Sequence, residues 1–250
     1  MIRYAKRIES RKTHMQTIPF SHLLLMLFPL SIVAYMYYRW IGNKKEIFLS
    51  TLRMSVQLIL IGYVLTSLFQ TNASWLLMLL LAVMVTAASF IARRNIHSRN
   101  VKLFGLIFAA ITLGGSVNLV WVLWGVLSLD DPLAPRFVIP LAGMIYANAM
   151  NAISLCAERY EKELERHNHE TARAIAFKAS MMPQINQFLA VGLVSLPGMM
   201  TGQILSGIDP LIAVRYQIVV MAMILSSGAM SNMLYLALIS KLRITPRTNG

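Results

Sequence analysis

The sequence predicts an all-α, polytopic integral membrane protein, a bundle of about seven transmembrane helices. Of its 250 residues, 57% are apolar and only 13% are charged, against about 25% charged residues in an ordinary soluble domain. All ten acidic residues lie between long apolar runs or at their edges, and apolar runs of about 17–25 residues cross a bilayer as helices. So few charges disfavour a water-soluble enzyme of this length.

Seven apolar runs follow one another along the chain. Each must be helical, because lipid offers no partner to an unpaired backbone group. The sixth is interrupted by Pro197-Gly198, since proline removes a backbone donor and clashes with the preceding turn. The runs are Ile18–Tyr38, Ile47–Phe69, Trp75–Ile91, Leu103–Leu127, Phe137–Cys156, Phe188–Leu205 and Ile212–Ser240.

The basic residues indicate how the helices are oriented. The net charge is +13, but because Lys and Arg flank the apolar runs, lipid headgroups and cytoplasmic loops explain it better than nucleic acid. Fifteen Lys and Arg lie in residues 39–46, 92–102, 157–187 and the tail after Ser240, whereas the alternate loops hold only Arg136 and Arg215. The C-terminus is therefore expected in the cytoplasm. Five basic residues in 1–17 conflict with an outside N-terminus, so the side of the N-terminus stays open.

These features predict three parts of the chain. Residues 1–17 form a basic tail, residues 18–240 a transmembrane domain, and residues 241–250 a cytoplasmic tail. Within the domain, the polar segment 157–187 carries five acidic and five basic residues. One interpretation is a solvated helical extension of the fifth run, with i,i+4 pairs such as Arg159–Glu163. The other is a docking element, because Thr171–Met182 is Ala-rich and amphipathic.

Polar residues inside the apolar runs are candidates for a translocation path. Arg53 and Gln57 share one face of the second run, although Arg53 can also snorkel to the headgroups. Asn148 and Asn151 lie three apart in the fifth run, where they can instead bridge neighbouring helices.

The broken sixth run gives the remaining path candidates. Discontinuous helices often build transport sites, whereas the alternative here is tight helix packing at Gly198 and Gly202. The candidate residues of this run are Ser195, Pro197, Gly198, Met199 and Met200.

Motifs for catalysis and cofactors are missing from the sequence. It contains no HExxH, no paired CxxC and no P-loop, and its one cysteine, Cys156, excludes a disulfide framework. We therefore expect no enzyme activity, no metal site and no cofactor bound by this chain itself.

Three strings carry a family resemblance. They are VGLVSLPGMMTG at 191–202, continued by GIDP at 207–210; IPLAGMI at 139–145 with Asn148–Met150; and Arg53 with QLI at 57–59 and GYVL at 62–65. Together they resemble the FetB-type permeases, membrane subunits of a two-component ABC exporter linked to iron export, with plant relatives linked to aluminium tolerance. The resemblance covers roughly residues 40–240.

The resemblance implies a permease subunit driven by a separate ABC-type ATP-binding subunit, which would hold ATP and Mg. It also implies a homodimer of the permease, and a place in the inner (plasma) membrane. Segment 157–187 would couple to the ATPase through Glu165, Glu170, Arg173, Ile175, Phe177 and Lys178. The alternative is an ATP-independent secondary transporter or a membrane scaffold, but the embedded acidic residues that ion coupling usually requires are missing. The substrate stays open among a metal ion, a chelate and an organic solute.

Overall fold

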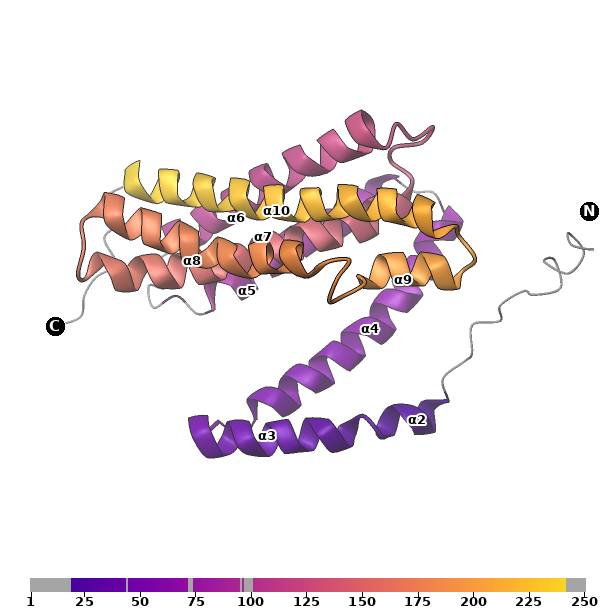
Figure 1. Ribbon diagram of the computed structural model, residues 1–250, viewed down its shortest axis with the longest axis horizontal. Coiled ribbons are helices and arrows are strands. Elements are labelled where there is room, and N and C mark those ends of the chain that lie inside the picture. The colour runs from indigo at the N-terminus through magenta and orange to yellow at the C-terminus, as the bar shows by residue number, and fades with distance from the viewer. Residues whose placement is uncertain (1–18, 44, 72–73, 95, 97–100, 242–250) are drawn as a thin grey trace, which may run out of the picture. The chain divides into compact units, whose positions relative to one another are not determined.

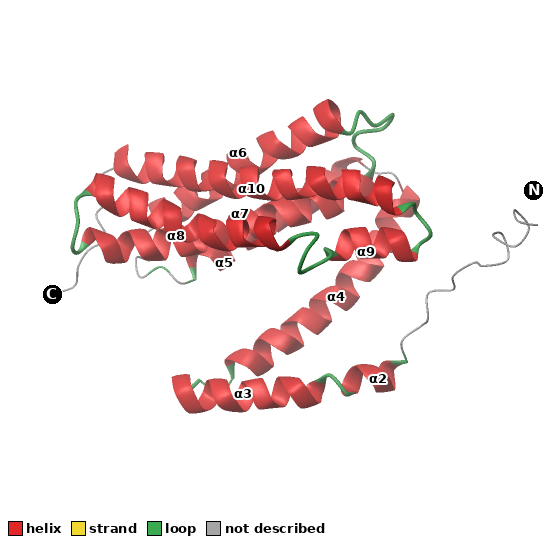
Figure 2. Cartoon of the chain, viewed as in Figure 1, coloured by secondary structure: helices red, strands yellow, loops and turns green. Residues whose placement is uncertain are grey.

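The computed structural model describes residues 19–43, 45–71, 74–94, 96 and 101–241. The predicted basic tail 1–17 and residues 242–250 of the predicted C-terminal tail lie outside this part of the chain. The described residues are largely helical and form no β-strand, apart from one isolated bridge between Val191 and Ser195 (Figure 2). The chain divides into two compact units, the first made of residues 1–71 and 205–207 and the second of 72–204 and 208–250.

The first unit contains α2 (Phe20–Leu24), α3 (Leu27–Ile41) and α4 (Glu46–Thr71). Gly42 ends α3 with a left-handed φ of 81°, and its N–H donates to the carbonyl of Tyr38 at 2.8 Å. This is the usual way in which glycine closes a helix. The hydroxyl of Tyr37 and the side-chain amide of Asn43 both donate to the Glu46 carboxylate, at 2.6 and 3.0 Å. Glu46 therefore ties the end of α3 to the start of α4.

The second unit is a helical bundle centred on α7 and α10 (Figure 1). α7 contacts α5, α6 and α8, and α10 contacts α6, α7 and α8. A π-helical segment, η1, continues α6. The helices are α5 (Ser74–Arg93), α6 (Val101–Val120), η1 (Trp121–Val126), α7 (Pro135–Leu164), α8 (His169–Ala190), α9 (Gly198–Leu205) and α10 (Pro210–Lys241).

Small residues fill the helix contacts of this bundle. Ala110, Ala142, Ala149 and Ala213 are completely buried. Helices in lipid gain little from burying apolar surface against each other, so close backbone approach through small side chains supplies the packing. The second unit is built in this way, which is typical of a membrane bundle.

Six helices of the described residues are long and apolar enough to cross a membrane. They correspond to the first, second, third, fourth, fifth and seventh predicted runs, which confirms the polytopic helical fold. The sixth run is broken, as predicted, and the non-helical part is longer than Pro197-Gly198. α8 ends at Ala190, Val191–Pro197 forms a loop, and α9 begins at Gly198.

Backbone geometry explains where the break begins. Gly192 has a φ of +85°, a conformation that L side chains rarely adopt. The N–H groups of Val194 and Ser195 both donate to the carbonyl of Ala190, at 2.8 and 3.2 Å. The chain therefore turns directly after α8. Pro197 then precedes α9, and its carbonyl accepts from the N–H of Thr201 at 3.0 Å.

Candidate functional site

The turn between α7 and α8 joins two helices that pack side by side (Figure 1). Asn168 caps α8, because its side-chain oxygen accepts from the N–H of Thr171 at 2.9 Å. Such a cap satisfies one of the backbone donors that the first helical turn leaves free. The hydroxyl of Tyr160 on α7 lies 2.9 Å from Nδ1 of His169 on α8, so this hydrogen bond crosses the turn. The position of α8 relative to α7 is thus fixed at this end of the bundle.

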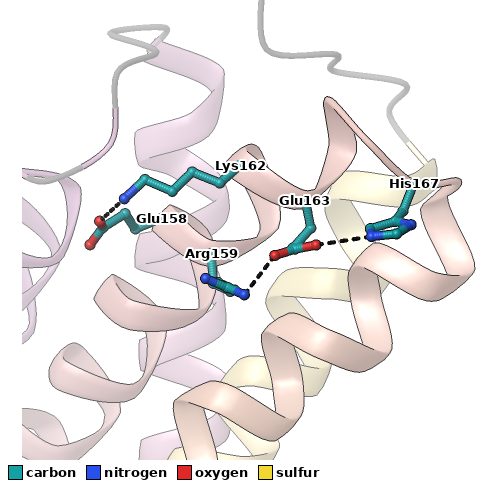
Figure 3. Close-up of polar contacts among 5 residues, drawn as sticks. All are labelled: Glu158, Arg159, Lys162, Glu163 and His167. Carbon is teal, nitrogen blue, oxygen red and sulfur yellow. Dashed lines mark hydrogen bonds and ion pairs between the residues drawn. The ribbon is translucent and has the colours of Figure 1, made fainter.

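Ion pairs on α7 reinforce the same turn (Figure 3). The Glu163 carboxylate lies 2.7 Å from the Arg159 guanidinium and 3.4 Å from Nε2 of His167. The pairing of Arg159 with Glu163 confirms the predicted i,i+4 contact. Lys162 and Glu158 form a second pair at 2.7 Å. Only 12% of the Glu163 side chain is exposed, so this carboxylate faces the protein. It connects α7 to His167 in the turn.

Segment 157–187 consists of two helices rather than one extension of the fifth run. Residues 157–164 complete α7, and residues 169–187 lie in α8. Ala172 and Ala176 are completely buried, so one face of α8 packs in the bundle. The opposite face presents most of the predicted coupling residues. Glu165, Glu170, Arg173 and Lys178 are exposed, and Ile175 and Phe177 are half-buried.

A groove lies between α8 and α10 near this face. Its volume is about 300 Å³. Two predicted coupling residues, Arg173 and Phe177, contribute to its wall. The groove is lined by Arg173, Ala174, Phe177, Met233, Leu236 and Ala237. Its mostly apolar lining with one cation at the rim is typical of a surface that accepts an amphipathic segment.

The predicted translocation residues belong to both units. Arg53 and Gln57 are exposed on α4, in the first unit. Asn148 donates to the carbonyl of Met144 in its own helix at 2.8 Å, and Asn151 is exposed.

In the broken run, Ser195 and Gly198 are exposed, whereas Pro197, Met199 and Met200 are half-buried. Their role in a path stays a prediction.

The sequence interpretation missed a buried polar cluster on α6, α8 and α10. The amide of Asn118 on α6 donates to Ser226 on α10 at 2.7 Å, and the amide of Asn232 on α10 donates to Ser180 on α8 at 2.9 Å. Gln184 and Ser231 are also buried there. One sequence signal was available, since Ser180 and Gln184 lie four apart, as do Ser227 and Ser231, and this spacing puts each pair on one helical face.

Two glycines let the helices meet at this cluster. A Cβ added at Gly114 of α6 would lie 2.5 Å from Oγ of Ser231 and 2.8 Å from its backbone nitrogen. A Cβ at Gly228 of α10 would collide with the side-chain amide of Gln184. Position 114 therefore requires glycine for the observed packing, because it faces backbone atoms, whereas at Gly228 the Gln184 side chain would have to shift. The polar side chains of α8 and α10 lie directly against a neighbouring backbone as a result.

Charged metal ligands do not gather in the described part of the chain. No group of three or more His, Cys, Asp and Glu side chains is placed there so that it could hold a metal ion. The polar cluster is made of amides and hydroxyls together with the thioether of Met181, which accepts from the Asn232 amide at 3.7 Å, and all of these groups are neutral. Its chemistry is that of hydrogen bonding and weak oxygen coordination.

The chain matches a family model and several known proteins. The model of the uncharacterised protein family UPF0014 matches residues 19–177 and 169–243. The probable iron export permease protein FetB of Escherichia coli is 36% identical over 208 residues, covering 76% of this chain and 78% of FetB. Protein ALUMINUM SENSITIVE 3 of Arabidopsis thaliana is 32% identical over 206 residues, covering 76% and 74%.

A bacterial relative without a named substrate is equally similar. The UPF0014 membrane protein YjkA of Bacillus subtilis is 35% identical over 210 residues, covering 76% of this chain and 81% of its own length. No solved structure matches the chain. The apolar helices, the broken run and these matches lead to one conclusion: the chain belongs to the UPF0014 family of polytopic membrane proteins.

Proposed function

We propose that this chain is the membrane-spanning permease subunit of an ABC-type exporter of metal cations. A separate ATP-binding subunit would hold ATP and Mg²⁺ and supply the energy. Its relative FetB is named as a probable iron export permease, which supports the direction and the substrate class. On this proposal the chain itself carries out no chemical reaction and binds no cofactor of its own.

The observation that carries the proposal is the α7–α8 hairpin. Its turn lies at the same end of the bundle as the C-terminal end of α10 (Figure 1). The distribution of Lys and Arg over the loops supports a cytoplasmic location for this end. There α8 exposes Glu170, Arg173 and Lys178, while its alanine face packs inside. An ATPase that bound this exposed face would act on a helix embedded in the bundle.

The α7–α8 hairpin can transmit a displacement from its turn to the loop that follows α8. α8 has 22 residues, so it is about 33 Å long at 1.5 Å per residue. It begins at the turn where Asn168 caps it and ends at Ala190, directly before the loop Val191–Pro197. A movement at the cytoplasmic end would therefore reach the broken sixth run along one continuous helix.

Two copies of the chain would form the complete exporter. Among its described residues, one chain has six long apolar helices and the broken sixth run. A two-fold axis is the commonest way to complete such an assembly. In this arrangement, each permease subunit would bind one ATPase subunit. The exporter would lie in the plasma membrane, which is the inner membrane of a bacterium with two membranes, and its C-termini would be cytoplasmic.

Affinity purification from native membranes tests this function. A tagged chain is expected to recover a protein with a P-loop. Charge reversal of the exposed α8 face, Arg173→Glu with Lys178→Glu, should weaken recovery at least about tenfold, or about 1.4 kcal/mol. The matched control is Arg136→Glu, since Arg136 is exposed at the opposite end of α7. Recovery of the chain without any ATPase would favour an ATP-independent transporter or scaffold instead.

A further inference from the structure

The groove between α8 and α10 is open on the surface of the second unit. It has a volume of about 300 Å³, and Arg173 is the charged residue in its lining. Leu236 is buried and closes the groove on the inside, whereas Met233 is apolar and 57% exposed. An exposed apolar groove with a guanidinium in its wall suits a ligand that is itself amphipathic.

The groove lies where the apolar part of α10 ends. α10 carries no charged residue between Arg215 and Lys241, and Ala237 of the groove lies four residues, or about one helical turn, before Lys241. Charged residues at the ends of an apolar helix lie at the membrane surface. The groove therefore begins at the level of the lipid headgroups.

The direction of α8 determines which end of the groove carries the cation. The α7–α8 turn, where α8 begins, lies at the same end of the bundle as the C-terminal end of α10 (Figure 1). Arg173 is the groove residue nearest to this turn on α8, and Phe177 follows one turn deeper. On α10, Met233 likewise lies one turn deeper than Ala237. The cation is thus at the headgroup end, and Phe177 and Met233 lie toward the acyl chains.

Arg173 is available to a phosphate group. Within the part of the chain that the structure describes, this exposed side chain forms no salt bridge. The one acidic residue of α8, Glu170, lies one turn toward the α7–α8 turn and outside the groove lining. A guanidinium binds a phosphate through two parallel N–H donors. Lys178, exposed next to Phe177 in the sequence, adds a second positive charge, which favours a lipid with net negative charge over a zwitterionic one.

The length of the groove favours a lipid over a partner's helix. A helix that docks in a groove uses apolar anchors at i, i+3 or i+4 and i+7, which extend over about two turns. The groove residues lie within 173–177 of α8 and 233–237 of α10, about one turn of each helix. A lipid needs only this length for its glycerol backbone and the start of one acyl chain, because the rest of the chain continues into the bilayer.

We propose that the groove between α8 and α10 binds an acidic phospholipid of the cytoplasmic leaflet. The Arg173 guanidinium donates to the lipid phosphate, and Phe177, Met233 and Leu236 contact the glycerol backbone and one acyl chain. This inference goes beyond the proposed function and depends neither on an ATPase nor on the exported substrate. The bound lipid joins α8 to α10 beside the α7–α8 turn, so the lipid composition of the membrane acts on the helix that carries the exposed coupling residues.

Native mass spectrometry of the purified permease, without any ATPase, tests the site. Delipidated protein in detergent receives phosphatidylglycerol and phosphatidylcholine in equal amounts, and we expect it to bind phosphatidylglycerol preferentially. Arg173→Gln should weaken this binding at least about fivefold, the contribution of one basic residue at an acidic membrane surface. The matched control is Arg166→Gln, which removes the same charge from an exposed residue of the α7–α8 turn, outside the groove. It should keep wild-type binding.

A second substitution tests the apolar part of the groove. Ala237 is exposed, so Ala237→Phe fills the groove from the surface and leaves every charge of α8 in place. It should weaken phosphatidylglycerol binding to a similar extent, with an unchanged melting temperature as the check that the protein is folded. Glycerol 3-phosphate carries the phosphate without acyl chains and should not compete with the lipid.

Four results would overturn the proposal. They are equal binding of phosphatidylcholine and phosphatidylglycerol, wild-type lipid binding by both Arg173→Gln and Ala237→Phe, an equal loss of binding with Arg166→Gln, and competition by glycerol 3-phosphate. A partner's helix in the groove would also overturn it, since Ala237→Phe would then reduce recovery of the ATPase and leave lipid binding intact. Because lipid binding is measured without an ATPase, its failure would leave the proposed function standing.

Discussion

Glu163 is the carboxylate on which the α7–α8 turn depends. It pairs with Arg159 on its own helix and with His167 at the end of the turn, and the protein covers most of its side chain. Its neighbour Glu158 pairs with Lys162, whose side chain is 57% exposed. The two glutamates lie on one helix and differ in burial, since 12% of the Glu163 side chain and 34% of the Glu158 side chain are exposed. They therefore form a natural matched pair for a test.

Glu163→Gln should destabilise the protein by about 1 kcal/mol, since it removes the carboxylate charge that pairs with Arg159 at a partly covered site. Glu158→Gln should change the free energy of unfolding by less than about 0.5 kcal/mol, because its pair is exposed to solvent. Thermal unfolding in detergent measures both. Equal effects of the two substitutions would show that Glu163 is an ordinary surface charge.

At the residue scale, the sequence predicts local contacts better than distant ones. The Arg159–Glu163 pair follows from helical spacing alone and is confirmed. The contact of Glu163 with His167 depends on a turn at residues 165–168 that the charge pattern does not reveal. Ser180 and Gln184 were missed because they follow a strongly charged stretch, so the segment has low hydropathy although one face of its helix is buried.

Gly114 determines how closely α6 approaches α10. A methyl group there would meet the backbone nitrogen and Cα of Ser231, at 2.8 and 3.0 Å, and backbone atoms of a packed helix cannot move aside cheaply. Gly105 lies on the same helix and has no atom within 4 Å of an added Cβ. A comparison of alanine substitutions at Gly114 and Gly105 therefore separates the effect of packing on stability from that of helix propensity.

Gly114→Ala should destabilise the bundle by about 1–3 kcal/mol through overpacking. Gly105→Ala should be neutral or stabilise by up to about 1 kcal/mol, because alanine is the better helix former. Melting temperatures of the two variants in the same detergent measure the difference. A Gly114→Ala protein as stable as the wild type would mean that α6 and α10 are farther apart than the contact between Gly114 and Ser231 requires.

At the scale of the elements, hydropathy locates the helices and misjudges some of their ends. The third run, predicted as Trp75–Ile91, is α5, Ser74–Arg93. The fifth was predicted to end at Cys156, yet α7 continues to Leu164, because hydropathy reports the membrane and not the helix. The sixth run is divided between α8, a loop and α9, since its apolar residues belong to two helices and to the non-helical loop between them.

At the scale of the whole molecule, three features follow one another along α8. The exposed coupling face is at its start, the buried residues Ser180 and Gln184 lie in its second half, and the loop Val191–Pro197 follows its end. One helix therefore connects the proposed ATPase contact with the buried polar cluster and the broken sixth run. The Ala-rich, amphipathic sequence of Thr171–Met182 predicts that one face of α8 is buried. The packing of this face against α10 depends on contacts between residues far apart in the sequence, which the sequence does not predict.

ATP-driven metal flux measures the central claim most directly. The permease and the ATPase recovered with it are reconstituted into liposomes, and Mn²⁺ uptake is followed into vesicles whose ATPase subunits face outward. We expect uptake that requires ATP and the ATPase subunit, and that falls at least about tenfold with Arg173→Glu and Lys178→Glu, which weaken the contact between the subunits. Uptake of the same rate without ATP or without the ATPase would contradict the account.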